Sequence, residues 1–178
     1  MKLFNSQNLL SASLCSLLGL LTLFAGSYPL VKAQSEPKLG CQATVDKILQ
    51  EIRSKGVRRT WFKLYEERAN ENNTGNPTNR TDELHIILSA WDFTKKPTFD
   101  SRSQSIIDNI MGSKSLLKSW ADRIVVNCSN TAIVGFGNDQ SDWGEDYYIQ
   151  SDGTTKLNKC VKPENAPSPL PWGVSVCL

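Results

Sequence analysis

The chain has 178 residues, of which 39% are hydrophobic and 21% are charged, and these proportions are close to the average for globular domains. They exclude a low-complexity tail and a collagen-like rod. Lys and Arg number 20 against 18 Asp and Glu, and the excess comes from Lys2 and Lys32, in an N-terminal segment that we expect to be removed. The remaining domain is formally neutral, which argues against a nucleic-acid-binding protein and against a polybasic membrane protein.

Residues 1–33 have the layout of a secretory signal peptide. A positive charge at Lys2 precedes an apolar run over residues 9–26, and Val31-Lys32-Ala33 offers small side chains at a cleavage site. The apolar run barely reaches the ~18 residues at which a membrane-spanning helix becomes a candidate, so an uncleaved anchor is the alternative. We expect a signal peptide, and therefore a secreted or periplasmic protein without stable membrane insertion after cleavage.

A lipid anchor is a separate possibility that the sequence argues against. Leu14 stands before Cys15, where a lipoprotein signal needs a small residue, and most of the apolar run follows that cysteine. Cleavage leaves roughly 145 residues, enough for one domain. We expect residues 34–40 to be a flexible lead-in and residues 41–178 to form a single, monomeric domain with a Pro-rich C-terminal tail.

The mature chain keeps four cysteines, and an even number in an exported chain favours two disulfides. Four cysteines permit three pairings, and we prefer Cys41 with Cys128 and Cys160 with Cys177. Zinc binding by these cysteines is the rival interpretation, but the sequence contains no C-x-x-C spacing.

The N-terminal part of the domain is predicted to be helical. Apolar residues at helical spacing predict a helix that begins at Thr44 and ends at Gly56. Apolar residues within 57–65 keep a helical spacing too, and we favour a second helix on that ground; the aromatic residues between Thr60 and Tyr65 make a strand the alternative. The polar residues 70–81 should form an exposed loop.

Further along the chain the apolar pattern changes its period. Residues 84–91 form an apolar run typical of a strand covered on both faces. Ser101 and Gln104 resemble a capping box that opens a helix ending at Gly112, and Ser113 can cap another. Four short apolar blocks then predict strands over residues 124–128, 131–136, 147–150 and 154–160, of which the last two flank the hairpin signal Asp152-Gly153. Early helices and late strands predict an α+β domain, in which N-terminal helices pack on a small, largely antiparallel sheet stapled by disulfides.

The candidate site is the acidic segment between the predicted strands 131–136 and 147–150. We predict that it binds a ligand through Asp139, Asp142, Trp143, Glu145 and Asp146. Carboxylate oxygens suit calcium, yet the spacing departs from an EF-hand, since Trp143 stands where a ligand should be. We therefore expect no cofactor, with calcium as the alternative, and a plain solvated loop as the simplest interpretation.

The sequence contains a single histidine, His85, which excludes most catalytic arrangements and zinc sites that need a base or two imidazoles. His85 lies in an apolar run, so we assign it a structural role. No assembled set of catalytic groups is visible in the sequence.

The segment Ile133-Val-Gly-Phe-Gly-Asn-Asp-Gln-Ser-Asp-Trp143, with Cys160 and the ending Leu170-Pro-Trp-Gly-Val-Ser-Val-Cys-Leu178, resembles small uncharacterised exported proteins of cyanobacteria. The resemblance covers about the last third of the chain and implies a bacterial periplasmic or extracellular setting. It implies no activity and no catalytic residue.

We thus expect a non-enzymatic extracytoplasmic domain that binds a protein, a glycan or a small ligand. The first alternative is a glycosidase-like hydrolase that works through carboxylates alone, with the acids of the candidate site and Asp92 as its candidates. The second alternative is an assembly factor for an envelope complex.

Overall fold

The first helix follows the predicted pattern. The computed structural model describes residues 40–71, 73–94 and 96–176. Helix α1 (Cys41–Ser54) buries the apolar stripe that the spacing predicts, including Ile48 and Ile52. The chain leaves this helix at Gly56, whose φ of 105° is accessible to glycine at little cost. The helix begins three residues before Thr44, whose side chain is buried within it and does not cap it.

The second predicted helix is wrong, because these residues form a strand. Strand β1 (Arg59–Tyr65) pairs with β3 (Asp82–Ser89) in antiparallel fashion along its whole length. The β-branched and aromatic side chains of Thr60, Trp61 and Phe62 fit a pleated surface better than a helix. Here the pairing with a neighbouring strand outweighs the helical spacing of the apolar residues.

Five strands form the central sheet, in the order β1-β3-β6-β7-β8. The last three are β6 (Thr131–Asn138), β7 (Gly144–Ile149) and β8 (Thr155–Leu157). Only β3 and β6 are parallel, and the other neighbours are antiparallel. The fold is therefore α+β with a mostly antiparallel sheet, as the sequence predicts. The Asp152-Gly153 turn joins β7 to β8, with φ of 82° at Gly153.

Two helices connect the parallel strands β3 and β6. These are α2 (Ser101–Gly112) and α3 (Lys114–Asn127). Asp100 caps α2 by accepting a hydrogen bond from the Ser103 backbone, so the predicted Ser101 cap is wrong by one residue. Residues 124–127 are the last turn of α3 and not a strand, because Ile124 and Val125 continue the buried stripe of that helix.

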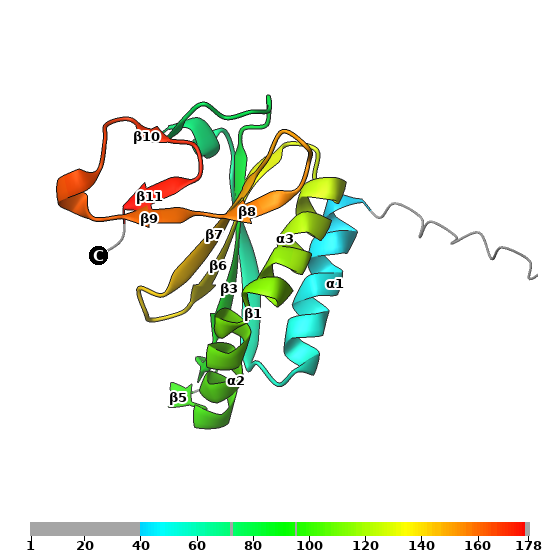
Figure 1. Cartoon of the computed structure of the whole chain (residues 1–178). Coiled ribbons are helices and arrows are strands. Elements are labelled where there is room, and N and C mark those ends of the chain that lie inside the picture. Colours follow the sequence, from blue (N-terminus) through cyan, green and yellow to red (C-terminus); the bar gives the residue numbers. More distant parts are fainter. Residues whose placement is uncertain (1–39, 72, 95, 177–178) are drawn as a thin grey trace, which may run out of the picture. The chain divides into compact units, whose positions relative to one another are not determined.

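All three helices contact the same face of the sheet, and the core lies between them (Figure 1). Trp120 of α3 packs on Phe136 of β6, which in turn meets Tyr147 of β7 edge to face. The disulfide Cys41–Cys128 joins the start of α1 to the end of α3 and confirms one predicted pair. The other predicted pair includes Cys177, which lies outside the described residues, as does the predicted signal peptide.

Short ladders lie outside the central sheet. Strand β2 (Asn73–Thr74) pairs with β10 (Leu170–Pro171), β9 (Lys159–Val161) with β11 (Val174–Val176), and β4 (Trp91–Asp92) with β5 (Thr98–Phe99). Two 3-10 helices lie at Arg68–Asn70 and Pro163–Asn165. Trp172 fixes the C-terminal segment: its ring meets Tyr148 at 5.0 Å, and its Nε1 donates to the Ile149 carbonyl at 2.8 Å.

Figure 1 shows the β9–β11 segment on the side of the sheet away from α1 and α3. We call this segment the C-terminal strap. No described helix combines the length and the apolar character that crossing a membrane would require.

Candidate functional site

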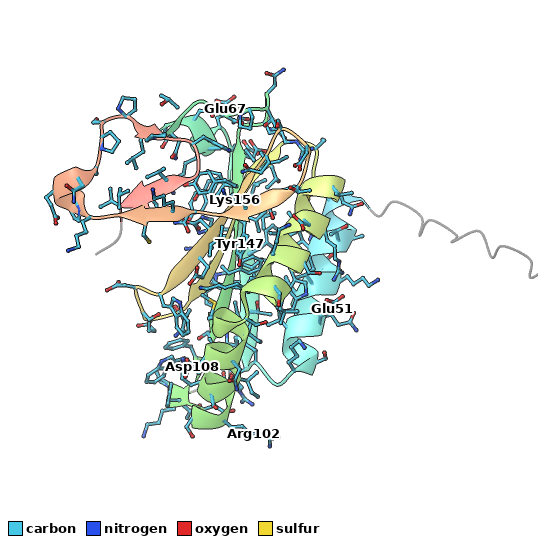
Figure 2. All side chains as sticks on the ribbon, in the orientation of Figure 1. Glu51, Glu67, Arg102, Asp108, Tyr147 and Lys156 are labelled. Atoms are coloured by element: carbon cyan, nitrogen blue, oxygen red, sulfur yellow. A yellow bond between two sulfur atoms is a disulfide. The ribbon has the colours of Figure 1, made fainter. Side chains whose placement is uncertain are left out.

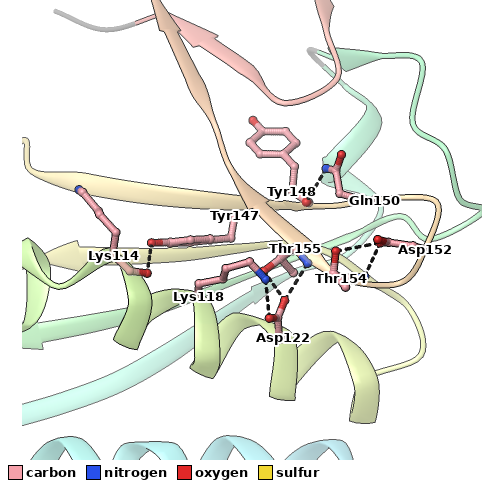
Figure 3. A network of polar contacts seen from close by, with 9 residues as sticks. All are labelled: Lys114, Lys118, Asp122, Tyr147, Tyr148, Gln150, Asp152, Thr154 and Thr155. Atoms are coloured by element: carbon pink, nitrogen blue, oxygen red, sulfur yellow. Dashed lines mark hydrogen bonds and ion pairs between the residues drawn. The ribbon is translucent and has the colours of Figure 1, made fainter.

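The candidate site lies on the face of the sheet opposite the helices, which we call the open face. Cross-strand partners share a face of a sheet, and the pairing aligns Lys63, His85, Gly135 and Asp146 in one row across four strands. Alternation along β7 sends Tyr147 to the helices, where its hydroxyl donates to the Lys114 carbonyl at 3.0 Å, while Tyr148 belongs to the open face (Figure 3). Figure 2 shows the dense packing of side chains around Tyr147.

His85 and Asp146 converge above Gly135. A Cβ atom on Gly135 would lie 2.7 Å from His85 Nε2 and 2.8 Å from Asp146 Oδ1, so the two atoms are no more than 5.5 Å apart. His85 Nε2 also lies 2.5 Å from Glu83 Oε1, two residues back on the same strand. A histidine between two carboxyl groups is therefore the centre of the open face.

A charged chain continues from this centre towards the strap. Arg68 Nε forms an ion pair with Glu83 Oε2 at 3.5 Å, and its guanidinium stacks on the Tyr65 ring at 4.5 Å. The Tyr65 ring meets the His85 ring edge to face at 5.5 Å. These contacts hold Glu83 and His85 in a defined orientation.

The two carboxyl groups have pKa values that move in opposite directions. Burial raises the pKa of Asp146, and the nearby charges of Glu83 and Glu145 add to this, while His85 opposes it. Burial also acts to raise the pKa of Glu83, but the hydrogen bond and charge of His85, together with Arg68, lower it overall. Neighbouring carboxyl groups with different proton affinities are typical of functional sites.

A groove of about 400 Å³ lies beside this centre, between the start of β7 and the C-terminal strap. Four of the five residues predicted to bind a ligand line it, namely Asp142, Trp143, Glu145 and Asp146. The other lining residues are Gly144, Asn158, Cys160, Ser175 and Val176. Trp143 keeps 38% of its surface exposed. Within the described part of the chain, the side chains that line the groove include three carboxylates and no basic group.

The predicted site residues do not all point the same way. Glu145 forms an ion pair with Lys114 of α3 and accepts a hydrogen bond from Trp143 Nε1 at 3.3 Å, so it is engaged on the helix side. Asp146 lies on the open face. Asp139 lies at the end of β6, where it accepts a hydrogen bond from Ser89 Oγ at 2.8 Å. The segment is thus a strand connection whose acids are distributed over both faces.

This distribution bears on the calcium alternative. Among the described residues, no group of three or more His, Cys, Asp or Glu side chains is arranged to hold a metal ion. Asp92, the other acid proposed for hydrolysis, lies on β4, where its pKa is lowered by hydrogen bonds from the backbone and hydroxyl of Thr94 and by Arg58.

Sequence reasoning did not identify Glu83 and His85 as residues of the candidate site. Their spacing of two residues in a strand places both on one face, which was visible in the sequence. The pairing of that strand with the strand of Gly135, across two intervening helices, was not visible.

Comparison with known proteins finds no matching family model, no matching curated protein and no matching solved structure.

Proposed function

We propose that the protein is a non-enzymatic extracytoplasmic binding domain whose site is the groove beside Asp146. The Cys41–Cys128 disulfide is consistent with an oxidising compartment outside the cytoplasm. The predicted signal peptide supports the same location.

The observation that carries this proposal is the groove itself. It brings the half-exposed ring of Trp143 together with the carboxyl groups of Asp142 and Asp146. A concave surface with an aromatic side chain and a few convergent polar groups is the usual form of a ligand site.

The chemistry of the groove favours a ligand with hydrogen-bond donors. Ionised carboxylates only accept hydrogen bonds, so hydroxyl, ammonium or guanidinium groups complement them, whereas phosphate and carboxylate groups are repelled. A glycan, a protein partner with basic side chains and a small amine all meet this requirement.

A ligand screen by NMR tests the proposal. Wild-type protein is exposed to a library of neutral oligosaccharides, Lys- or Arg-containing peptides and small amines, and each hit is repeated with Trp143→Ala and Asp142→Ala. We expect each substitution to weaken binding by roughly tenfold or more, the loss typical of a central contact.

Two variants on other surfaces control for general effects. Asp46→Ala removes an exposed carboxylate of α1, and Phe99→Ala removes a half-exposed aromatic side chain of β5. Both should bind like the wild type. If every hit kept its affinity in Trp143→Ala and Asp142→Ala, the groove would not be the binding site.

A carboxylate-dependent hydrolase is the second candidate, and the pKa difference between Glu83 and Asp146 favours it. The raised pKa of Asp146 suits the role of general acid, and the lowered pKa of Glu83 suits the role of base or nucleophile. Release of reducing ends from oligosaccharides should then disappear in both Glu83→Gln and Asp146→Asn. Activity that survives both substitutions would exclude this mechanism.

A further inference from the structure

Strand β1 forms one border of the central sheet, and its outer edge faces no other strand of that sheet. The hydrogen bonds of β3 show which backbone groups of β1 point outwards. The Leu88 carbonyl accepts a hydrogen bond from the Asp139 backbone at 2.7 Å, on the side of β6, and backbone groups alternate in direction along a strand. Odd-numbered residues of β3 therefore turn towards β1, where their partners are the odd-numbered residues of β1. The N–H and C=O groups of Thr60, Phe62 and Leu64 consequently point away from the sheet.

These outward groups form a row that another strand can join. Within the part of the chain that the structure describes, no backbone hydrogen bond links them to another element. Such a row is a template for strand pairing, and proteins often block it with a proline or a bulge. Strand β1 contains no proline and pairs with β3 without a shift in register.

The helix layer also stops short of this edge. On the helix side of β3, Leu84, Ile86 and Leu88 are at most 1% exposed. On the same side of β1, Leu64 is 46% exposed and Phe62 is only partly buried. An incoming strand would therefore find apolar side chains to contact as well as unpaired backbone groups.

A second copy of β1 can pair with the first about a two-fold axis, because such a contact uses the same residues on both sides. The pairing is then antiparallel, and outward groups must face outward groups. This condition leaves only registers in which one residue lies opposite itself at the centre. Among them, the register centred on Phe62 pairs the strand along its whole length, because Phe62 is the middle residue of β1.

The charged side chains favour the same register. With Phe62 at the centre, Lys63 of one copy lies opposite Trp61 of the other. Arg59 lies opposite Tyr65, and a cation beside an aromatic ring is a favourable contact. A centre at Trp61 would set Arg59 against Lys63, and a centre at Lys63 would set that lysine against itself. Like charges directly opposite each other destabilise a strand pair.

The residues that flank the strand have complementary charges. Arg58 precedes β1 and Glu66 follows it, and both are exposed. The register centred on Phe62 brings Arg58 of each copy next to Glu66 of the other. Opposite charges at both ends of a contact favour this register over shifted ones.

We infer that two copies of this chain form a dimer in which their β1 strands pair in antiparallel fashion, centred on Phe62. The dimer replaces the monomer that the sequence predicts, and it does not depend on the proposed ligand site. Its two-fold axis runs perpendicular to the sheet, so the open faces of both copies lie on the same side. Because each copy contributes one short strand, the interface is small and the dimer dissociates on dilution.

Sedimentation velocity tests the dimer with protein recovered from an exporting host, its disulfides intact. The wild type should change from monomer to dimer as its concentration rises. Leu64→Pro should raise the dissociation constant at least about tenfold, because proline removes an outward N–H and leaves the hydrogen bonds to β3 in place. Val126→Ser is the control: it removes an exposed apolar side chain of α3 and should dimerise like the wild type.

Cysteine cross-linking tests the register and does not rely on the proline variant. Residues 60 and 64 of the two copies lie opposite each other, at a Cα separation of about 5.5 Å that a disulfide can span. An oxidised mixture of Thr60→Cys with Leu64→Cys should therefore form a covalent dimer. Neither variant should do so when oxidised alone, because neither position lies opposite itself.

Three results would overturn the inference. The first is a wild type that stays monomeric up to its solubility limit, including one whose free edge binds a strand of a different protein. The second is a folded Leu64→Pro, as shown by circular dichroism, that dimerises as tightly as the wild type. The third is a dimeric wild type whose two cysteine variants fail to cross-link when mixed. If Leu64→Pro does not fold, the cross-linking result decides.

Discussion

Gly135 determines the geometry of the site at the scale of single residues. Because this position lacks a side chain, His85 and Asp146 can approach each other from neighbouring strands until both lie within 3 Å of the point where a Cβ would stand. The approach places a carboxyl group in a setting that raises its pKa through burial.

Gly135→Ala and Gly137→Ala form a matched pair that tests this account. Gly135→Ala should lower the free energy of unfolding by about 1 to 3 kcal/mol, since the added methyl group collides with His85 and Asp146. Gly137→Ala, one step further along the same face, should leave it unchanged or raise it by up to about 1 kcal/mol. Urea unfolding measures both. Equal effects of the two substitutions would contradict the crowding above Gly135.

The raised pKa of Asp146 predicts that removing its charge makes the protein more stable at neutral pH. A raised pKa in the folded state means that ionisation of this carboxyl destabilises the fold. The destabilisation grows as the pH rises above the ordinary pKa of an aspartate side chain. Asp146→Asn should therefore be more stable than the wild type at about pH 7, and the difference should vanish at about pH 3.

Glu83→Gln should show the opposite sign. The lowered pKa of Glu83 means that its ionised form stabilises the fold when the pH is above the ordinary pKa of a glutamate side chain. This contribution is lost as the pH falls. Its substitution should reduce stability at neutral pH and have less effect in acid. Denaturant unfolding of both variants across this range would reveal two curves that diverge from the wild type in opposite directions. Parallel curves would contradict the assignment.

At the scale of elements, the edge strand β8 is held to α3 by one carboxylate (Figure 3). Asp122 accepts hydrogen bonds of 2.7 Å from both the backbone N–H and the hydroxyl of Thr155, and it forms an ion pair with Lys118 at 2.6 Å. These bonds fix the end of the sheet from which the C-terminal strap continues. The position of the groove therefore depends on a contact made on the opposite side of the sheet.

Asp122→Ala should lower the free energy of unfolding by roughly 1 to 3 kcal/mol, because the backbone N–H and the hydroxyl of the buried Thr155 both lose their acceptor. Lys118→Ala removes only the exposed side of the ion pair and should cost at most about 1 kcal/mol. Thermal unfolding compares the two. The contact would be unimportant if Asp122→Ala cost no more than Lys118→Ala.

Local sequence patterns predicted elements well where burial alone decided them. Helical stripes identified α1, α2 and the start of α3, and the Asp-Gly turn identified the hairpin of β7 and β8. The pattern failed at β1, whose partner β3 lies beyond a loop that no local rule bridges. It also treated residues 139–146 as one acidic loop, although strand alternation separates Glu145 from Asp146.

At the scale of the whole molecule, the two faces of the sheet differ. The three α-helices pack on one face and bury a continuous core there, whereas the C-terminal strap and the 3-10 helix of Arg68 lie against the other face. This asymmetry explains why the titratable groups gather on the open face. It could not be derived from the sequence, because it depends on the parallel pairing of β3 with β6 and on the return of the C-terminal segment.

The disulfide stabilises this arrangement as a whole. It links two cysteines that are 87 residues apart in the sequence and joins the first helix to the end of the third. The double variant Cys41→Ser with Cys128→Ser should lose about 4 to 5 kcal/mol of unfolding free energy by the loop-entropy estimate. Urea unfolding without reductant measures the loss. A loss below about 1 kcal/mol would show that packing alone holds α1 on the sheet.

The central claim is that ligands bind on the open face and in the adjoining groove. Two-dimensional ¹H–¹⁵N NMR of labelled protein, titrated with a ligand found in the screen, tests it most directly. The account predicts that the shifted amide signals belong to Gly135, Gly137, Gly144 and Asp146. Shifts confined to the exposed surfaces of α1 and α3 would contradict it.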